Sequence, residues 1–256
     1  MSETVHYDEA ATLPGKADDP YVYGLRTCGA GMTAYNGFVW PKEGWVEAPD
    51  WMPAPICGGG LHFLRDGEGD IALLNSVPDA VWMVVRALSD ETVDIDGAKS
   101  KARRCEVVFA GSRPEAVSLL RSIVGTGKRI PFVCEEAGDS STQTAGYSST
   151  QTAGYRSTQT AGYSSTQTAG YRSTQTAGYR STQTAGNSST QTAGDRSTQQ
   201  GGEGSVFISR WWDDEQDRWR VSVAIVGMDG TLKPDTPYRC EGGVWTEVSE
   251  AEGGDA

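Results

Sequence analysis

The chain has 256 residues, of which 37% are hydrophobic, and a formal net charge of −12 at pH 7. This length allows one or two ordinary domains, whereas the acidic balance argues against nucleic acid as a partner, because phosphate binding needs a basic face. The five cysteines include no close Cys-x-x-Cys pair typical of zinc knuckles or redox centres, so we expect reduced structural thiols and no cofactor. The sequence also shows no secretory signal and no run of about 18 apolar residues.

Residues 20–136 contain much of the hydrophobic sequence and predict a small α+β domain, after a flexible N-terminus at residues 1–19. Residues 81–88 and 106–110 are rich in β-branched side chains and predict strands. Pro114 followed by an amphipathic stretch to residue 124 predicts a helix with proline in its first turn.

The strongest candidate for a catalytic or metal-binding site in this domain is His62 near Cys57, with Cys28 and Cys105 elsewhere. Such groups could form a nucleophile pair or a metal site. No activating carboxylate motif or glycine-rich phosphate loop accompanies them, so we favour a packed histidine and structural thiols. The expectation is therefore that the protein is not an enzyme.

From Ser141 to Thr198 the chain repeats an eight-residue unit, Ser-Thr-Gln-Thr-Ala-Gly-Tyr followed by Ser or Arg. Each Ser-Thr-Gln-Thr-Ala predicts a short strand with both threonines on one face, and the glycine is expected to supply the corner. Two units of 16 residues in total would make one coil of a β-solenoid. We predict about four coils over residues 137–203.

The predicted coils place threonines in columns on two opposite faces, where their hydroxyls and methyls could hold water in fixed positions. Such a grid is chemically suited to ice. On this basis we expect the ice-binding residues of one face to be Thr142, Thr144, Thr158, Thr160, Thr174, Thr176, Thr190 and Thr192. Those of the opposite face would be Thr150, Thr152, Thr166, Thr168, Thr182 and Thr184, with Thr198 extending it.

The interior and edges of the solenoid are expected to hold ladders of identical side chains. Glutamines would stack inside as amide ladders beside Ser and Ala. Tyrosines recurring every 16 residues would form two stacked edges, one with Tyr147, Tyr163 and Tyr179 and the other with Tyr155 and Tyr171. The alternative is that this Ser/Thr/Gln/Gly-rich tract is a flexible linker.

Residues 204–247 predict a β-rich cap, followed by a flexible tail at residues 248–256. Val206 and Ile208 alternate with polar residues, as do Val221, Val223 and Ile225 after the polar segment 213–217. This pattern is typical of a hairpin. Directly after the last coil, it can cover an end whose backbone would otherwise be unpaired.

The string Ala-Gly-Tyr-x-Ser-Thr-Gln-Thr resembles the repeat of bacterial ice nucleation proteins. Segments such as 25–28, 37–41, 79–82, 104–111, 204–213 and 235–238 resemble the flanking domains of that family, in the same order. The resemblance implies that Thr-x-Thr columns order water as ice, and that the protein lies at the bacterial outer membrane. The repeat here is far shorter, and its two half-units are alike, so the sequence does not indicate which face is used.

The resemblance also implies self-association, with the arginines near the end of the repeat as assembly residues. They are Arg156, Arg172, Arg180 and Arg196, and the alternative is that they are ordinary solvated charges. As candidate assembly residues we single out Arg180 and Arg196 together with the five tyrosines. The partners expected are water or ice and further copies of the chain. Two alternatives stay open: a repeat that acts as a spacer or adhesin stalk, and an enzyme in the N-terminal domain. A soluble cytoplasmic protein is the alternative to the outer-surface localisation.

Overall fold

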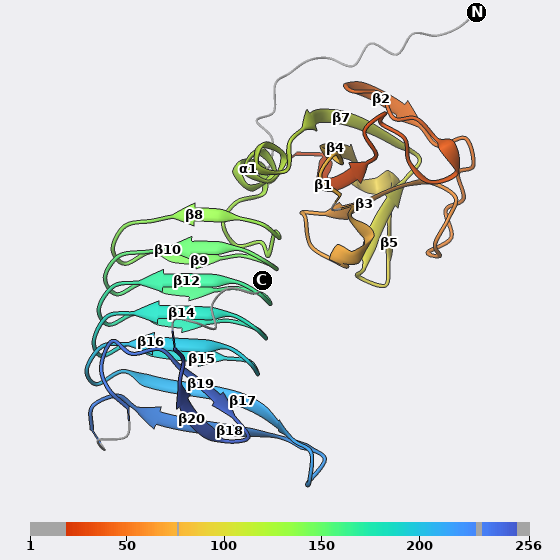
Figure 1. Cartoon of the computed structure of the whole chain (residues 1–256). Helices are drawn as coiled ribbons and strands as arrows, with labels where there is room; N and C mark the ends of the chain where they lie inside the picture. Colours follow the sequence, from red (N-terminus) through yellow and green to blue (C-terminus); the bar gives the residue numbers. More distant parts are fainter. Residues whose placement is uncertain (1–18, 76, 229–231, 250–256) are drawn as a thin grey trace, which may run out of the picture. The chain divides into compact units, whose positions relative to one another are not determined.

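The computed structural model describes residues 19–75, 77–228 and 232–249 (Figure 1). The chain divides into two compact units: the first ends at Gly125, and the second begins at Thr126 and also includes Ile71–Leu73. The flexible ends predicted at residues 1–19 and 248–256 fall mostly outside the described residues. The first unit ends ahead of residue 136 because the chain has by then joined the solenoid. The N–H of Phe132 already donates to the carbonyl of Tyr147 at 2.8 Å.

Within its described residues, the first unit is an antiparallel sheet with one α-helix. Its strands, in the spatial order β2-β7-β4-β1-β3-β6-β5, are β1 (Tyr21–Cys28), β2 (Gly44–Glu47), β3 (Leu61–Arg65), β4 (Val81–Leu88), β5 (Thr92–Ile95), β6 (Lys99–Ala102) and β7 (Arg104–Gly111). Short 3₁₀ turns of this unit lie at Tyr35–Gly37 and Ser89–Glu91, while a third, Ile71–Leu73, belongs to the second unit. Strands β4 and β7 confirm the two predicted from β-branched content.

The predicted helix is α1 (Arg113–Val124), which packs on β4, β1 and β7. Ser112 and Glu115 form a capping box that satisfies backbone N–H groups at its start, and Pro114 stands in its first turn. Gly125, at φ 82°, ends the helix. Its buried face presents Ala116, Val117 and Leu120 to the sheet.

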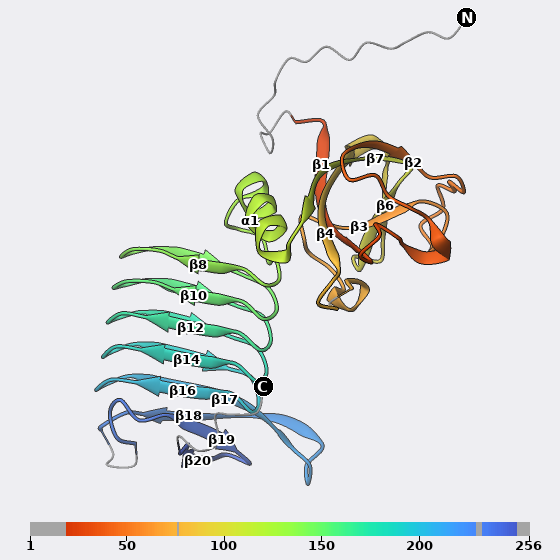
Figure 2. The same ribbon diagram turned by 45° about the horizontal axis from the view of Figure 1, so that its top comes forward.

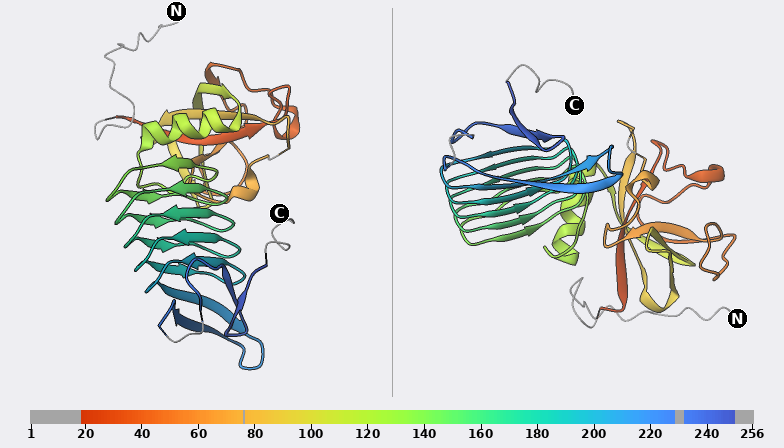
Figure 3. Two further views of the ribbon diagram at one scale, coloured as in Figure 1. Left: turned by 60° about the vertical axis from the view of Figure 1, so that its left-hand side comes forward. Right: turned by 90° about the horizontal axis from the view of Figure 1, so that it is seen from below.

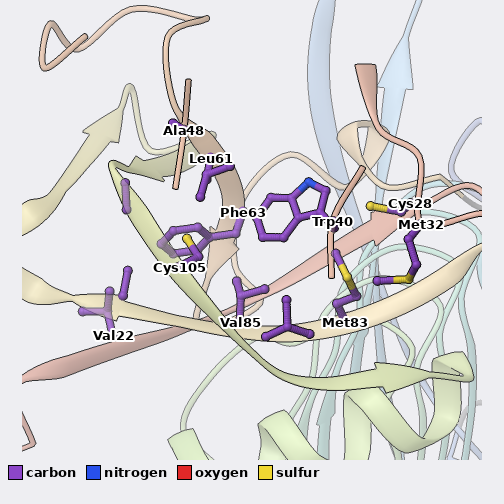
Figure 4. Close-up of a cluster of buried hydrophobic side chains, with 13 residues drawn as sticks. Val22, Cys28, Met32, Trp40, Ala48, Leu61, Phe63, Met83, Val85 and Cys105 are labelled. Atoms are coloured by element: carbon purple, nitrogen blue, oxygen red, sulfur yellow. The ribbon is translucent and has the colours of Figure 1, made fainter. Parts of the chain in front are cut away.

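The core of this unit gathers side chains from several strands around Trp40 and Phe63 (Figure 4). Strand β4 lies between β7 and β1, and its adjacent residues Met83 and Val84, which point to opposite faces, are both completely buried. This burial fits a strand covered on both faces. The core therefore explains the near-continuous apolar run of β4.

The second unit contains the solenoid, whose short strands alternate between two parallel sheets (Figure 2). One sheet contains β8 (Cys134–Glu136), β10 (Thr150–Thr152), β12 (Thr166–Ala169), β14 (Thr182–Ala185) and β16 (Thr198–Gly201). The other contains β9 (Thr142–Thr144), β11 (Thr158–Thr160), β13 (Thr174–Thr176) and β15 (Thr190–Ala193). Every repeat strand pairs with the strand 16 residues away, which confirms the predicted coil length.

The solenoid has about five coils, rather than about four, because a strand outside the repeat joins it. In β8, Cys134 pairs in parallel with Thr150 and Glu136 with Thr152. The sheet thus begins before the predicted start at residue 137. The sequence of β8 has no threonine, which is why the period alone did not reveal it.

The corners correct one prediction, because the left-handed residue is not glycine but the Ser or Arg that follows the tyrosine, or that follows Asp139, Asn187 or Asp195 at the equivalent position. These residues have φ between 49° and 59° and are Ser140, Ser148, Arg156, Ser164, Arg172, Arg180, Ser188 and Arg196. Each conformation is held by the neighbouring coil: the N–H of Ser164, for example, donates to the carbonyl of Tyr179 at 2.9 Å. The glycines instead allow close packing of successive coils, since a Cβ on Gly162 would lie 2.8 Å from the carbonyl carbon of Gly146.

Both sheets end in a hairpin (Figure 3). Strand β17 (Val206–Asp213) continues in parallel from β15 and turns into β18 (Arg218–Ile225), which confirms the predicted hairpin. Strand β19 (Tyr238–Glu241) pairs antiparallel with β16 and turns into β20 (Val244–Glu247). Phe207 is fully buried with Val226, Leu232 and Tyr238, and this apolar cluster closes the polar interior of the solenoid.

Candidate functional site

The outer surfaces of the two solenoid sheets carry the threonines in regular columns. Within each strand the glutamine is buried while the threonines on either side point outward, as in Thr158-Gln159-Thr160. We call the surface of β9, β11, β13 and β15 the odd face and that of β10, β12, β14 and β16 the even face. The threonines predicted for each face occupy it in the structure.

The parallel register fixes the spacing of these columns. Thr158 pairs with Thr142 on one side and Thr174 on the other, so identical side chains repeat from strand to strand. Neighbouring strands are about 4.8 Å apart, and alternate residues along a strand about 6.8 Å apart. Hydroxyls and methyl groups therefore form a two-dimensional grid on each face.

Glutamine ladders hold the grid from inside, as predicted. The Nε2 of Gln159 donates to Oε1 of Gln143 at 2.8 Å and to the carbonyl of Thr168, in the opposite sheet, at 3.0 Å. Gln175 repeats this pattern one coil further along, with bonds to Gln159 and to Thr184. Because hydrogen bonds in a dry interior are strengthened, these amides fix both the stacking of the coils and the distance between the sheets.

Serines supply a second ladder at the start of each strand. The N–H of Ser165 donates to Oγ of Ser181 at 3.3 Å, and Oγ of Ser165 donates to the carbonyl of Gly146 at 3.2 Å. Both serines are buried. The backbone that carries the threonines is therefore tied to the adjacent coils over most of its length, and the grid is preorganised.

The two tyrosine edges differ. Tyr155 and Tyr171 stack with ring centroids 5.6 Å apart and an interplanar angle of 10°, which confirms a ladder on that edge. On the other edge, Tyr147 meets Phe132 edge-on at 82°, while the side chain of Tyr163 is 63% exposed. The structure therefore supports only the first of the two predicted ladders.

Arginines lie along both edges, and three of them contact a tyrosine of the same coil or of the preceding one. The guanidinium carbon of Arg156 lies 4.9 Å from the ring centroid of Tyr155, and that of Arg172 lies 5.0 Å from that of Tyr171. Arg196 donates from Nη1 to the hydroxyl of Tyr179 at 3.0 Å. Arg180 is exposed at its corner. These contacts stabilise the edges and leave the role in assembly as a prediction.

The chemical candidates of the first unit have different partners from those the sequence indicated. Cys57 is exposed, and Nζ of Lys99, 3.0 Å from its Sγ, lowers the pKa of the thiol. Desolvation lowers the pKa of His62 to about 4, so the imidazole is neutral at pH 7. Lys101 is buried and donates to the carbonyls of Ile56 and Gly58 on either side of Cys57. Sequence patterns gave no signal for these lysines.

The remaining cysteines divide into two groups. Cys28, Cys105 and Cys240 are buried, as expected of structural thiols, and burial raises the pKa of Cys105 to about 12. Cys134 lies at the surface. Over the described residues, no group of three or more His, Cys, Asp or Glu side chains is placed to hold a metal ion.

The class of protein that this architecture defines is a β-solenoid with two Thr-x-Thr faces. The profile of a family described as "Domain of unknown function (DUF7666)" matches residues 22–119, within the first unit. An ice nucleation protein from Pseudomonas fluorescens is 34% identical over 97 residues, which are 38% of this chain and 8% of that protein. The relationship to that protein is therefore distant and partial.

No solved structure matches the chain significantly. None of the helices within the described residues is both long and apolar enough to cross a membrane.

Proposed function

We propose that the protein binds and orders ice through the Thr-x-Thr columns of its solenoid, without catalysing a reaction. The observation that carries this proposal is the in-register stacking of threonines on a rigid glutamine interior. The name of the distant relative, ice nucleation protein, supports the same function. The relative is matched over a small part of its length, so the function of this chain rests chiefly on the grid.

The chemistry of threonine suits this role. Each hydroxyl can donate one hydrogen bond and accept others, so it anchors a water molecule at a defined point. The adjacent methyl group offers no hydrogen bond, and the water around it is restricted in orientation. A rigid array of both groups holds many waters in positions fixed in advance, which lowers the entropy lost when those waters join a crystal.

Freezing of droplets that contain the purified full chain tests the proposal. A variant with lysine at Thr158, Thr174, Thr166 and Thr182 places charges in the middle of both faces, where all four side chains are exposed. We expect its freezing temperature and its effect on ice growth to fall to those of buffer. Circular dichroism should show unchanged β content.

Valine at the same four positions is the matched control, because it keeps the branched shape and the methyl group of threonine and replaces the hydroxyl with a second methyl group. We expect it to retain part of the activity. If droplets that contain the wild-type protein freeze at the same temperature as buffer, and ice grows in them at the same rate, the proposal is excluded. Equal ice activity of the lysine variant and the wild type would overturn the role of the threonine columns, whereas an inactive wild type would favour a spacer or adhesin stalk, which does not need threonine.

The outer-surface localisation implied by family resemblance stays a prediction, and fractionation of native cells would check it. Self-association is likewise a proposal, since the tyrosine edges and the exposed Arg180 and Arg196 offer contacts to a second copy.

A further inference from the structure

The two threonine faces have the same repeat sequence but differ in how their columns continue into the cap. On the odd face, β17 pairs with β15 so that Val206 is aligned with Thr190 and Ile208 with Thr192. Strand β18 then continues the same two columns. Its residues on them are Ile225, opposite Val206, and Val223, opposite Ile208.

These four residues lie on the outer surface of the sheet and not in the core of the cap. Phe207 and Ser209, which alternate with them in β17, are buried, whereas Val206 and Ile208 are partly exposed. The side chain of Val223 is 61% exposed. Burial therefore does not explain why these positions are apolar.

The even face is bounded by charged and hydrogen-bonded groups. At its first strand, Glu136 takes the place of the second threonine, beside Thr152. At its last strand, Gln200 stands where a threonine would be, and its Nε2 donates to the carbonyl of Asp235 at 2.9 Å. Arg239 of β19 is aligned with Thr198.

Charged and apolar boundaries act differently on ordered water. A carboxylate or guanidinium orients its own hydration shell around the charge, which competes with the arrangement of the neighbouring waters. Valine and isoleucine are β-branched like threonine and present methyl groups. They therefore continue the surface shape of the threonine columns and restrict the orientation of neighbouring water in the same way. The odd columns stay free of charge across six strands, β9 to β18 in sheet order. On the even face, three strands carry complete Thr-x-Thr pairs: β10, β12 and β14.

One cation does lie on the odd side of β17, outside the two columns. Arg210 is opposite Val221, and its guanidinium carbon is 4.4 Å from the ring centroid of Trp219. The charge is therefore folded onto an aromatic face at the margin of the sheet.

We propose that the odd face is the ice-ordering surface, and that Val206, Ile208, Val223 and Ile225 extend it. This inference rests on the proposed function, and it adds which of two chemically identical repeats contacts ice. The even face, closed at both ends by charged groups, is not required for activity.

Paired variants of the full chain test the choice of face. Thr158→Lys with Thr174→Lys changes two adjacent rows of the odd face, and Thr166→Lys with Thr182→Lys makes the same change on the even face. All four threonines are exposed, so both variants keep the interior intact. In droplet freezing and ice-growth assays, we expect the odd variant to lose at least tenfold in activity and the even variant less than twofold.

Val223→Lys tests the extension, with Val244→Lys of β20 as its control, because Val244 is similarly exposed at 66% but lies on the other sheet. We expect Val223→Lys to lower ice activity two- to threefold and Val244→Lys to leave it unchanged. Sedimentation velocity on the same samples distinguishes ice contact from self-association. A loss from Val223→Lys that coincides with a smaller sedimenting species would overturn the extension.

The outcomes separate this inference from the proposed function. If the wild type is inactive in both assays, the proposed function and the assignment of the face are both wrong. An active wild type with equal losses in the two threonine variants, or with the larger loss in the even variant, leaves the proposed function standing and overturns the assignment of the face.

Discussion

Gly162 has no side chain because the preceding coil leaves no room for one. A Cβ there would lie 2.8 Å from the carbonyl carbon of Gly146 and from the nitrogen of Tyr147, both backbone atoms tied into the stack. We predict that Gly162→Ala lowers the free energy of unfolding by about 1–3 kcal/mol, the usual cost of overpacking. Urea unfolding followed by circular dichroism measures it.

Gly138→Ala is the control for this substitution. Gly138 precedes the first complete repeat, its φ lies outside the left-handed region, and a Cβ there would meet nothing within 4 Å. Alanine at this position should be neutral or stabilise by up to about 1 kcal/mol through the unfolded chain. Equal destabilisation by both variants would mean that close approach is not the reason for the repeated glycine.

The left-handed corner residue of each repeat could not be predicted from residue type alone. Glycine favours corners in general, yet here the left-handed position falls on Ser164 and its equivalents, two residues later. The hydrogen bond from Ser164 to Tyr179 comes from the next coil, so it is a consequence of stacking. Alternation of threonine and glutamine, by contrast, depends only on the strand period and was predicted correctly.

At the scale of elements, the cap hairpin is held by Phe207, which alternates with the outward Val206 and Ile208 and is fully buried. Its ring centroid is 5.8 Å from that of Trp245. We predict that Phe207→Ala costs about 3–5 kcal/mol, as large-to-small substitutions in a core do. Hydrogen exchange should accelerate most in β15 to β17.

Val244→Ala provides the comparison, because Val244 is exposed in β20 and its truncation should change stability by less than about 0.5 kcal/mol. If Phe207→Ala leaves exchange in β15 and β16 at the wild-type rate, the cap does not stabilise the last coil, and the solenoid end is stable by itself.

Elements with a local signature were predictable, and those fixed by distant partners were not. Strand β4, helix α1 and the β17–β18 hairpin follow from periodicity and turn residues. Strand β8 has the sequence Cys-Glu-Glu, and becomes a strand because β10 offers it a paired edge. The sheet order β2-β7-β4-β1-β3-β6-β5 likewise depends on long-range pairing that no local pattern encodes.

At the scale of the whole molecule, the size of the threonine grid limits what one copy can do. The threonines of the candidate site could be placed on two faces from the sequence, but the choice between the faces needed the register of β17 and β18. Four threonine-bearing strands at about 4.8 Å cover roughly 20 Å along the axis. A surface of this length templates few waters at once.

Activity should therefore rise with the length of the solenoid. We predict that doubling the repeat in multiples of 16 residues, which preserves the register, raises the freezing temperature of droplets at equal molar concentration. The physical reason is that an ice nucleus grows spontaneously only above a critical size, and a longer face supports a larger one. Insertion of the same number of residues as a Gly/Ser-rich flexible linker is the control, because it lengthens the chain without extending the grid.

The dependence of freezing temperature on protein concentration and on salt distinguishes nucleation by a single threonine grid from nucleation that needs assembly. If single copies are too small, the wild type should nucleate more warmly as its concentration rises, whereas the doubled repeat should depend on concentration less. Added salt should weaken the wild type where assembly pairs the exposed Arg180 and Arg196 with acidic surfaces of another copy, since exposed charges are screened. A dilute sample, shown by sedimentation to be monomeric, that nucleates as warmly as the doubled repeat would contradict the dependence on area.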